Sequence, residues 1–121
     1  MMKKIGAIMY VIWGVLHLQA AQLTWTLGSS LEAGLVQARV HQGAFNLLFF
    51  GLTAIGIAVF LNWKNDKFGY WANCIMVSVV DVGFIWLVLA PGWIPLFPGV
   101  LGPLFWVLAI IFSTIAYRHE R

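Results

Sequence analysis

The sequence is poor in charge and nearly free of cysteine. Only 9% of its 121 residues are Asp, Glu, Lys or Arg, whereas about 25% of the residues in a soluble domain are charged. Cys74 is the single cysteine, which excludes an intrachain disulfide and a thiolate metal cluster. The sequence also has no Gly-rich phosphate loop, nucleophile elbow or clustered carboxylate pair. The familiar motifs of soluble enzymes are therefore missing.

Apolar residues fill the sequence instead. They make up 62% of the chain, and the mean hydropathy is +0.90. A soluble chain this short could not hide so much apolar surface, because small domains bury only part of what they expose when unfolded. Four apolar runs each come close to the roughly 20 residues that a helix needs to cross a bilayer. They extend over residues 5–27, 43–63, 70–90 and 98–117.

These runs predict an all-α membrane protein. Backbone amides inside a bilayer must be paired without water, which a helix achieves within one segment. The runs are continuous, whereas the strands of a membrane barrel alternate apolar and polar residues. We expect a single domain over residues 1–121, a four-transmembrane-helix bundle with short loops. A cleaved signal peptide is not expected, because the first run is too long and contains His17, Gln19 and Gln22.

The cationic residues predict the orientation. Lys and Arg are enriched in the cytoplasmic loops of membrane proteins, so we expect both termini in the cytoplasm and a cell (inner) membrane location. Of the seven Lys and Arg residues, only Arg39 is predicted on the outer side. The net charge of +3 follows from this distribution, and the expected partner is the lipid bilayer rather than a nucleic acid. The residues on the cytoplasmic side are Lys3, Lys4, Lys64, Lys67, Arg118 and Arg121.

The first outer connection, "SSLEAGLVQARV", contains a helix-start signal. Ser29 stands three residues before Glu32, which is the spacing of a capping box. A helix continuous from Leu31 to Trp63 would overshoot the bilayer by about a third. We therefore expect a short interfacial helix here, followed by a bend at Gly43.

The second outer connection, "PGWIPLFPG", has no charge and three prolines. Pro91 is placed to end the third helix and Pro98 to begin the fourth. Pro103 lies about one turn farther along and predicts a slight kink. The apolar side chains of this segment favour a loop that rests on the membrane over a lid that covers a cavity.

One acid interrupts the third run, in "VSVVDVGFIW". A carboxyl group in the middle of a bilayer costs about 2.5–3.5 kcal/mol, so Asp81 should face the bundle interior and find a partner. Counted from run starts near Ile5 and Gly69, His17 and Asp81 both lie about 18 Å deep at 1.5 Å per residue. The two side chains are expected to meet. Their contact has two interpretations, an intramembrane site or a packing contact worth about 0.6 kcal/mol.

Small and polar side chains at helical spacing mark the expected bundle interior. Around the pair we expect a ligand site whose aromatic side chains shape a pocket. If the site is catalytic, Asp81 and His17 are the candidates for proton transfer. The candidate ligand-binding residues are Asp81, His17, Tyr10, Trp13, Gln22, Asn46, Phe50, Ser78 and Trp86, with His41 and Gln42 at the entrance.

The sequence indicates no particular cofactor. Axial haem ligation would need two histidines at matched depth, but His41 lies well outward of His17. One His and one Asp are too few to close a metal site. We therefore predict no metal, and the choice between binding and catalysis stays open.

Three functions are compatible with these features. The first is the binding of an apolar or amphipathic small molecule, of the lipid, quinone or isoprenoid class, at Asp81 and His17. The second is proton-coupled transport. In its short chain, four predicted helices and one membrane carboxylate, the sequence resembles the small multidrug resistance family. That family has its essential acid in the first helix, where this chain has His17.

The general plan is also similar to that of the DoxX-like membrane proteins. The third function is that of a structural or accessory subunit, in which polar residues only specify helix packing. Gly43, Gly51 and Gly56 would then allow close approach within the bundle or between two copies, and a homodimer is a reasonable expectation.

Overall fold

The structure is a computed structural model that describes residues 1–121. It contains helices and no strand, and four helices are long and apolar enough to cross a membrane. The four are α1 (Met2–Ser29), α2 (Leu35–Phe60), α3 (Lys67–Phe84) and α5 (Leu101–His119). The short helices are η1 (Asn62–Lys64), η2 (Ile85–Leu89) and α4 (Leu96–Gly99). The prediction of an all-α protein with four apolar spans is confirmed.

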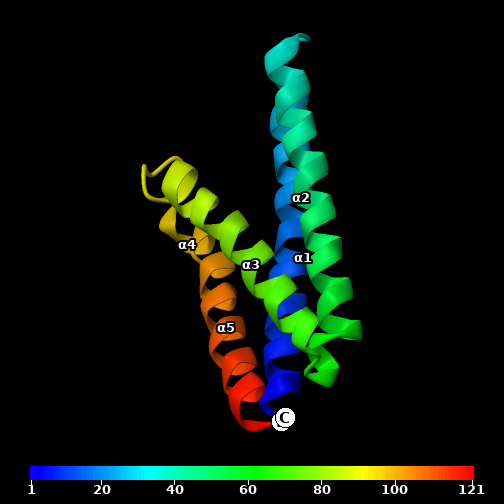
Figure 1. The fold of residues 1–121 in the computed structure, drawn as a ribbon. Coiled ribbons are helices and arrows are strands. Elements are labelled where there is room, and N and C mark those ends of the chain that lie inside the picture. Colours follow the sequence, from blue (N-terminus) through cyan, green and yellow to red (C-terminus); the bar gives the residue numbers. More distant parts are fainter.

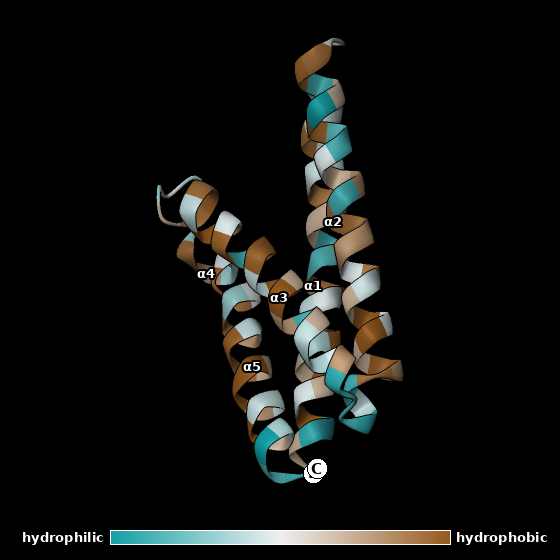
Figure 2. Ribbon diagram, viewed as in Figure 1, coloured by the Kyte–Doolittle hydropathy of each residue, from teal (hydrophilic) through white to brown (hydrophobic).

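The helices lie close together at one end of the molecule, and the end of α3, η2 and α4 lean away from α1 and α2 toward the other (Figure 1). α1 and α2 make a long antiparallel hairpin, and α5 packs along α1. Both chain termini lie at the closed end, where the Met1 ammonium group is 3.2 Å from Glu120 Oε1. Hydrophilic residues gather at this end, whereas hydrophobic residues predominate along α5 (Figure 2). We call the end that holds both termini the terminal end, and the opposite end the open end.

Small residues let α1 contact its neighbours closely. A Cβ atom on Gly14 would lie 2.7 Å from the Gly51 carbonyl oxygen, so α1 and α2 touch backbone to backbone. On the other side of α1, a Cβ atom on Gly6 would lie 2.9 Å from the backbone nitrogen of Ser113 in α5. These contacts make α1 the central helix. The buried hydrophobic core around it consists of Ala7, Tyr10, Trp13, Ala54, Ala58, Val77 and Ala109.

Of the three glycines expected at close contacts, only Gly51 lies at one. A Cβ atom on Gly43 or Gly56 would meet no heavy atom within 4 Å. The prediction is therefore wrong within the chain for these two positions, because both lie on faces of α2 that no other helix covers.

The predicted bend at Gly43 is also wrong, because α2 runs unbroken from Leu35 to Phe60. Its 26 residues make a helix about 39 Å long at 1.5 Å per residue, longer than the hydrocarbon layer of about 30 Å. The helix carries Gln37, Arg39 and Gln42 on its first turns. A straight helix can leave the layer through such polar turns, so no bend is required.

The first turns of α2 are attached to the end of α1, which explains why no separate interfacial helix forms. Gln37 Nε2 donates to the carbonyl oxygen of Gly28 at 3.0 Å and to that of Leu31 at 3.1 Å. The predicted capping box is wrong as well. Ser29 ends α1 and its hydroxyl donates to the Trp25 carbonyl oxygen at 3.1 Å, while Gly34 is the N-cap of α2.

The third apolar helix, expected over residues 70–90, begins three residues earlier, at Lys67. Asp66 is its N-cap, and Asp66 Oδ1 accepts a hydrogen bond from the Gly69 backbone N–H at 3.1 Å. The helix continues as η2 to Leu89, two residues before Pro91. The long apolar span of this part of the chain is therefore Lys67–Leu89.

The positions of Pro98 and Pro103 in their helices differ from the prediction. Pro98 lies inside the short helix α4, and α5 begins only at Leu101. Pro103 therefore occupies the first turn of α5, where a backbone N–H has no partner within the helix. A proline is accommodated there without a break, which removes the physical reason for the expected kink.

Candidate functional site

Asp81 and His17 meet inside the bundle, as the depth argument predicts. Asp81 is 0% exposed and His17 is 7% exposed. His17 Nε2 lies 3.6 Å from Asp81 Oδ1. That separation is slightly longer than a hydrogen bond between a nitrogen and an oxygen, so the two groups face each other without closing one. Asp81 Oδ1 has no other hydrogen-bond partner.

Trp13 supplies the contact that holds the acid. Its indole Nε1–H donates to Asp81 Oδ2 at 3.0 Å, and the indole is fully buried. The Trp13 ring also stacks on the His17 ring, with the centroids 3.7 Å apart. The two residues are four positions apart on α1, which places their side chains on the same helix face. One turn of α1 therefore presents both an N–H donor and an imidazole to α3.

The backbone determines which imidazole nitrogen faces the acid. His17 Nδ1 is 2.9 Å from the Trp13 carbonyl oxygen, and a carbonyl oxygen only accepts, so Nδ1 must carry a proton. In the neutral ring, Nε2 is then an acceptor. A hydrogen bond between Nε2 and Asp81 Oδ1 therefore requires one further proton, held by either the carboxyl group or the ring.

The pair lies level with the first turn of α5. A Cβ atom on Gly102, in the first turn of α5, would lie 3.5 Å from His17 Cε1. Beyond this level α1 continues to Ser29, while the end of α3, η2 and α4 lean away from it (Figure 1). The Trp13–His17–Asp81 group is therefore at the base of the open end of the molecule.

Two further predicted residues lie along the same interior. Tyr10 is fully buried one turn from Trp13, and its hydroxyl has no hydrogen-bond partner. Ser78 lies one turn before Asp81 on α3, and its hydroxyl accepts a hydrogen bond from Trp106 Nε1 at 2.9 Å. That bond joins α3 to α5 below the acid. These residues support the site from the terminal side.

The remaining predicted residues are not brought to the pair. Trp86 is 72% exposed on η2, and Gln22 and Asn46 are exposed on α1 and α2. Phe50 is half-buried on α2. The exposed side chains among them lie on helix faces that no other helix covers.

The two entrance residues lie at the tip of the hairpin. The His41 ring stacks on the Trp25 ring with centroids 3.8 Å apart, and His41 Nε2 is 3.3 Å from the Ser29 hydroxyl. Gln42 is exposed and its Oε1 accepts a hydrogen bond from Arg39 at 2.9 Å. Both side chains join turns of the same hairpin and stand apart from the Asp81 site.

Sequence reasoning missed a second buried polar contact. Asn73 on α3 is fully buried, and its Nδ2 donates to Asn62 Oδ1 at 2.9 Å and to the Ala54 carbonyl oxygen at 3.2 Å. These bonds attach α3 to the end of α2. The signal was present in the sequence, since Asn73 lies two turns before Asp81 on the same helix.

The surroundings do not add metal ligands to the pair. No three His, Cys, Asp or Glu side chains gather anywhere in the chain. Comparison with protein-family models, curated proteins and solved structures finds no match. The fold and the buried group by themselves define a small four-span membrane protein with an intramembrane His17–Asp81 pair.

Proposed function

We propose that the protein binds an amphipathic small molecule, of the lipid, quinone or isoprenoid class, whose polar head hydrogen-bonds to Asp81 and His17. The observation that carries the proposal is the unpartnered Oδ1 atom of a fully buried acid. Leaving such an atom unpaired costs about 1–3 kcal/mol. With one proton held by the pair, a hydroxyl group placed beside Oδ1 and His17 Nε2 would donate to one group, accept from the other and recover that cost.

The ligand would approach from the open end. The two main surface grooves are lined by other residues than Asp81 and His17. The proposed approach is past the first turn of α5, where Gly102 lies beside the His17 ring. An apolar tail would lie there against the bundle, with its head toward His17. Binding would then require α5 to move slightly away from α1 at Gly102.

Asp81→Asn tests the proposal with little disturbance of the fold. An asparagine oxygen can still accept from Trp13 Nε1, and its amide N–H can donate to His17 Nε2. The variant removes only the acid. Asp66→Asn is the matched control, because asparagine is as good an N-cap as aspartate and Asp66 is far from the site along α3.

The measurement is native mass spectrometry of the protein released from membranes in mild detergent. We expect a copurified small molecule with the wild-type protein and with Asp66→Asn, and its loss from folded Asp81→Asn. An identical adduct on Asp81→Asn would contradict the proposal. A wild-type protein that carries no such molecule under any mild extraction would contradict it as well, and would favour a packing role for the pair.

Proton-coupled transport is a second candidate, favoured by the tautomer of His17. Because Nδ1 is engaged with the Trp13 carbonyl oxygen, the pair is complete only with one proton between Nε2 and Oδ1. A substrate that displaces this proton would couple its own binding to proton release. Proteoliposomes with a pH gradient should then accumulate a lipophilic cation, and the Asp81→Asn protein should not. Equal accumulation by both proteins would reject this candidate.

A further inference from the structure

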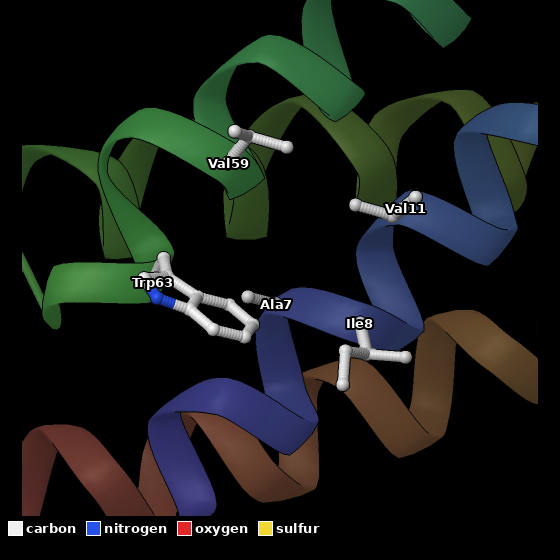
Figure 3. A pocket seen from close by; sticks show the side chains of 5 residues that line it. All are labelled: Ala7, Ile8, Val11, Val59 and Trp63. Carbon is white, nitrogen blue, oxygen red and sulfur yellow. The ribbon is translucent and has the colours of Figure 1, made fainter.

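An apolar groove lies near the terminal end, between α1 and the end of α2. Its volume is about 260 Å³, and hydrophobic residues alone line it. Figure 3 shows Val11 and Val59 facing each other across the groove, with the Trp63 ring closing one side. The lining residues are Ala7, Ile8, Val11, Val59 and Trp63.

A lysine stands at the end of this groove. On α1, Lys4 precedes Ile8 by four residues and Val11 by seven, so it belongs to the same helix face as the groove wall. Its Nζ atom lies 5.3 Å from the centroid of the Trp63 ring. Lys4 and Trp63 are both exposed. A groove suited to hydrocarbon therefore ends at an accessible ammonium group.

The acids at this end of the molecule are engaged elsewhere. Glu120 accepts hydrogen bonds from the Met2 and Lys3 backbone N–H groups at 2.8 and 3.1 Å. Asp66 caps α3. Lys4 has neither as a partner, and Lys64 adds a second exposed cation next to Trp63. The positive charge beside the groove is thus available to an anion.

We propose that this groove binds a phospholipid with an anionic headgroup, its acyl chain along the five lining residues and its phosphate at Lys4. Charge complementarity selects the occupant, because basic sites at the ends of membrane helices attract anionic lipids. The second main groove makes a useful contrast. Gln22 is its only polar lining residue, and no Lys or Arg lies over its Trp25 ring as Lys4 lies over Trp63, so it has no comparable contact for an anionic headgroup. The proposal is independent of the Asp81 site.

The first test compares phosphatidylglycerol with phosphatidylcholine of the same acyl chains. Each lipid is titrated into the detergent-solubilised protein, and bound lipid is counted by native mass spectrometry. We expect wild-type protein to prefer phosphatidylglycerol. One lysine near a membrane surface contributes about 1 kcal/mol, so Lys4→Gln should reduce that preference about fivefold.

Lys67→Gln is the matched control for charge. It removes one cation from the same end of the molecule but away from the groove lining. A general electrostatic effect would lower the preference equally in both variants and would overturn the proposal. Equal binding of the two lipids to the wild-type protein would overturn it too.

The second test fills the groove. Val59→Phe places a larger side chain where the acyl chain is proposed to lie, and Val79→Phe adds the same bulk on an exposed face of α3. We expect at least a fivefold loss of phosphatidylglycerol binding for the first variant only. Ile8→Trp fills the groove from α1, and repeats the test if Val59→Phe lowers the thermal midpoint. Unchanged binding in a folded groove-filling variant would overturn the proposal. Asp81→Asn should keep the wild-type lipid preference, which separates this result from the Asp81 site.

Discussion

A single indole N–H decides how the buried acid is held. Asp81 is fully buried, and its only closed side-chain hydrogen bond comes from Trp13 Nε1. Removing one partner of a buried pair leaves the other unpaired, whereas replacing both partners by apolar groups can be nearly neutral. The losses in the free energy of unfolding caused by substituting Trp13 and by substituting Asp81 should therefore be strongly non-additive.

Trp13→Phe tests this. The variant keeps an aromatic ring for His17 to stack on but removes the donor, and we expect a loss of about 1–3 kcal/mol in the free energy of unfolding. Adding Asp81→Leu should recover part of the loss. Denaturant unfolding in detergent measures both values. Trp106→Phe breaks the half-buried bond to Ser78 and should cost less. Strictly additive losses for Trp13→Phe and Asp81→Leu would contradict the argument.

The meeting of Asp81 and His17 was predictable, but the role of Trp13 was not recognised. The equal depth of His17 and Asp81 follows from the rise per residue of a helix. Because an acid in contact with lipid is costly, Asp81 is expected to face the bundle interior and find a partner there. From the sequence alone, Trp13 is one of several aromatic residues expected to shape a pocket. Its four-residue spacing from His17 was the available signal. The positions of Gln22, Asn46 and Trp86 away from the pair could not be predicted, because sequence does not tell which helix face lacks a neighbour.

At the scale of helices, the crossing of α1 and α2 depends on Gly51. A Cβ atom there would lie 2.9 Å from the Gly14 carbonyl oxygen, a backbone atom that cannot move away cheaply. We expect Gly51→Ala to cost about 1–3 kcal/mol through overpacking. Gly56→Ala is the control on the same helix, since its Cβ would meet no atom within 4 Å and helix propensity favours alanine by about 1 kcal/mol. Thermal unfolding in detergent should order them Gly56→Ala, wild type, Gly51→Ala. Equal midpoints for the two variants would contradict this.

Glu120 links the end of α5 to the start of α1. The backbone N–H groups of Lys3 and Met2, which have no partners within α1, bind its carboxylate and hold its pKa below the ordinary value of 4.5. A depressed folded-state pKa means that the stabilisation is complete above pH 4.5 and disappears as the pH falls through the lower, folded-state value. The thermal midpoint of wild-type protein should exceed that of Glu120→Gln at pH 7 and approach it in acid. A constant difference across this range would contradict the linkage.

Helix number and position could be predicted because bilayer thickness sets the length of an apolar run. The ends of α2 and α5 could not be predicted in the same way. Gly34 begins α2 because Gln37 binds the end of α1, a tertiary contact that no local signal records. Pro103 is compatible with a kink inside a helix and with the first turn of a helix. Which of the two applies depends on where α5 begins, and the packing of α5 against α1 decides where it begins.

At the scale of the whole molecule, the open end is the feature that sequence could not indicate. Lipid and helix surfaces are equally apolar, so a membrane helix has little hydrophobic reason to prefer one over the other. What draws the helices together is close small-residue packing and polar contacts, and both are concentrated between Gly6 and His17 on α1. Beyond His17 no polar contact joins α1 to α3, and the end of α3 with η2 and α4 leans away from the hairpin (Figure 1).

The charge distribution makes the orientation of the whole molecule testable. The contact between Met1 and Glu120 puts both termini at one end, together with every Lys and Arg except Arg39. Because cytoplasmic segments retain Lys and Arg, this end should face the cytoplasm. Single cysteines report the answer in a Cys74→Ser background: Ser30→Cys at the hairpin tip and His119→Cys at the end of α5, both exposed. In right-side-out vesicles, a membrane-impermeant maleimide should label the Ser30→Cys protein at once and the His119→Cys protein only after lysis. The reverse pattern would place the cationic end outside and would contradict this orientation. The phospholipid proposed at Lys4 would then come from the outer leaflet of the membrane.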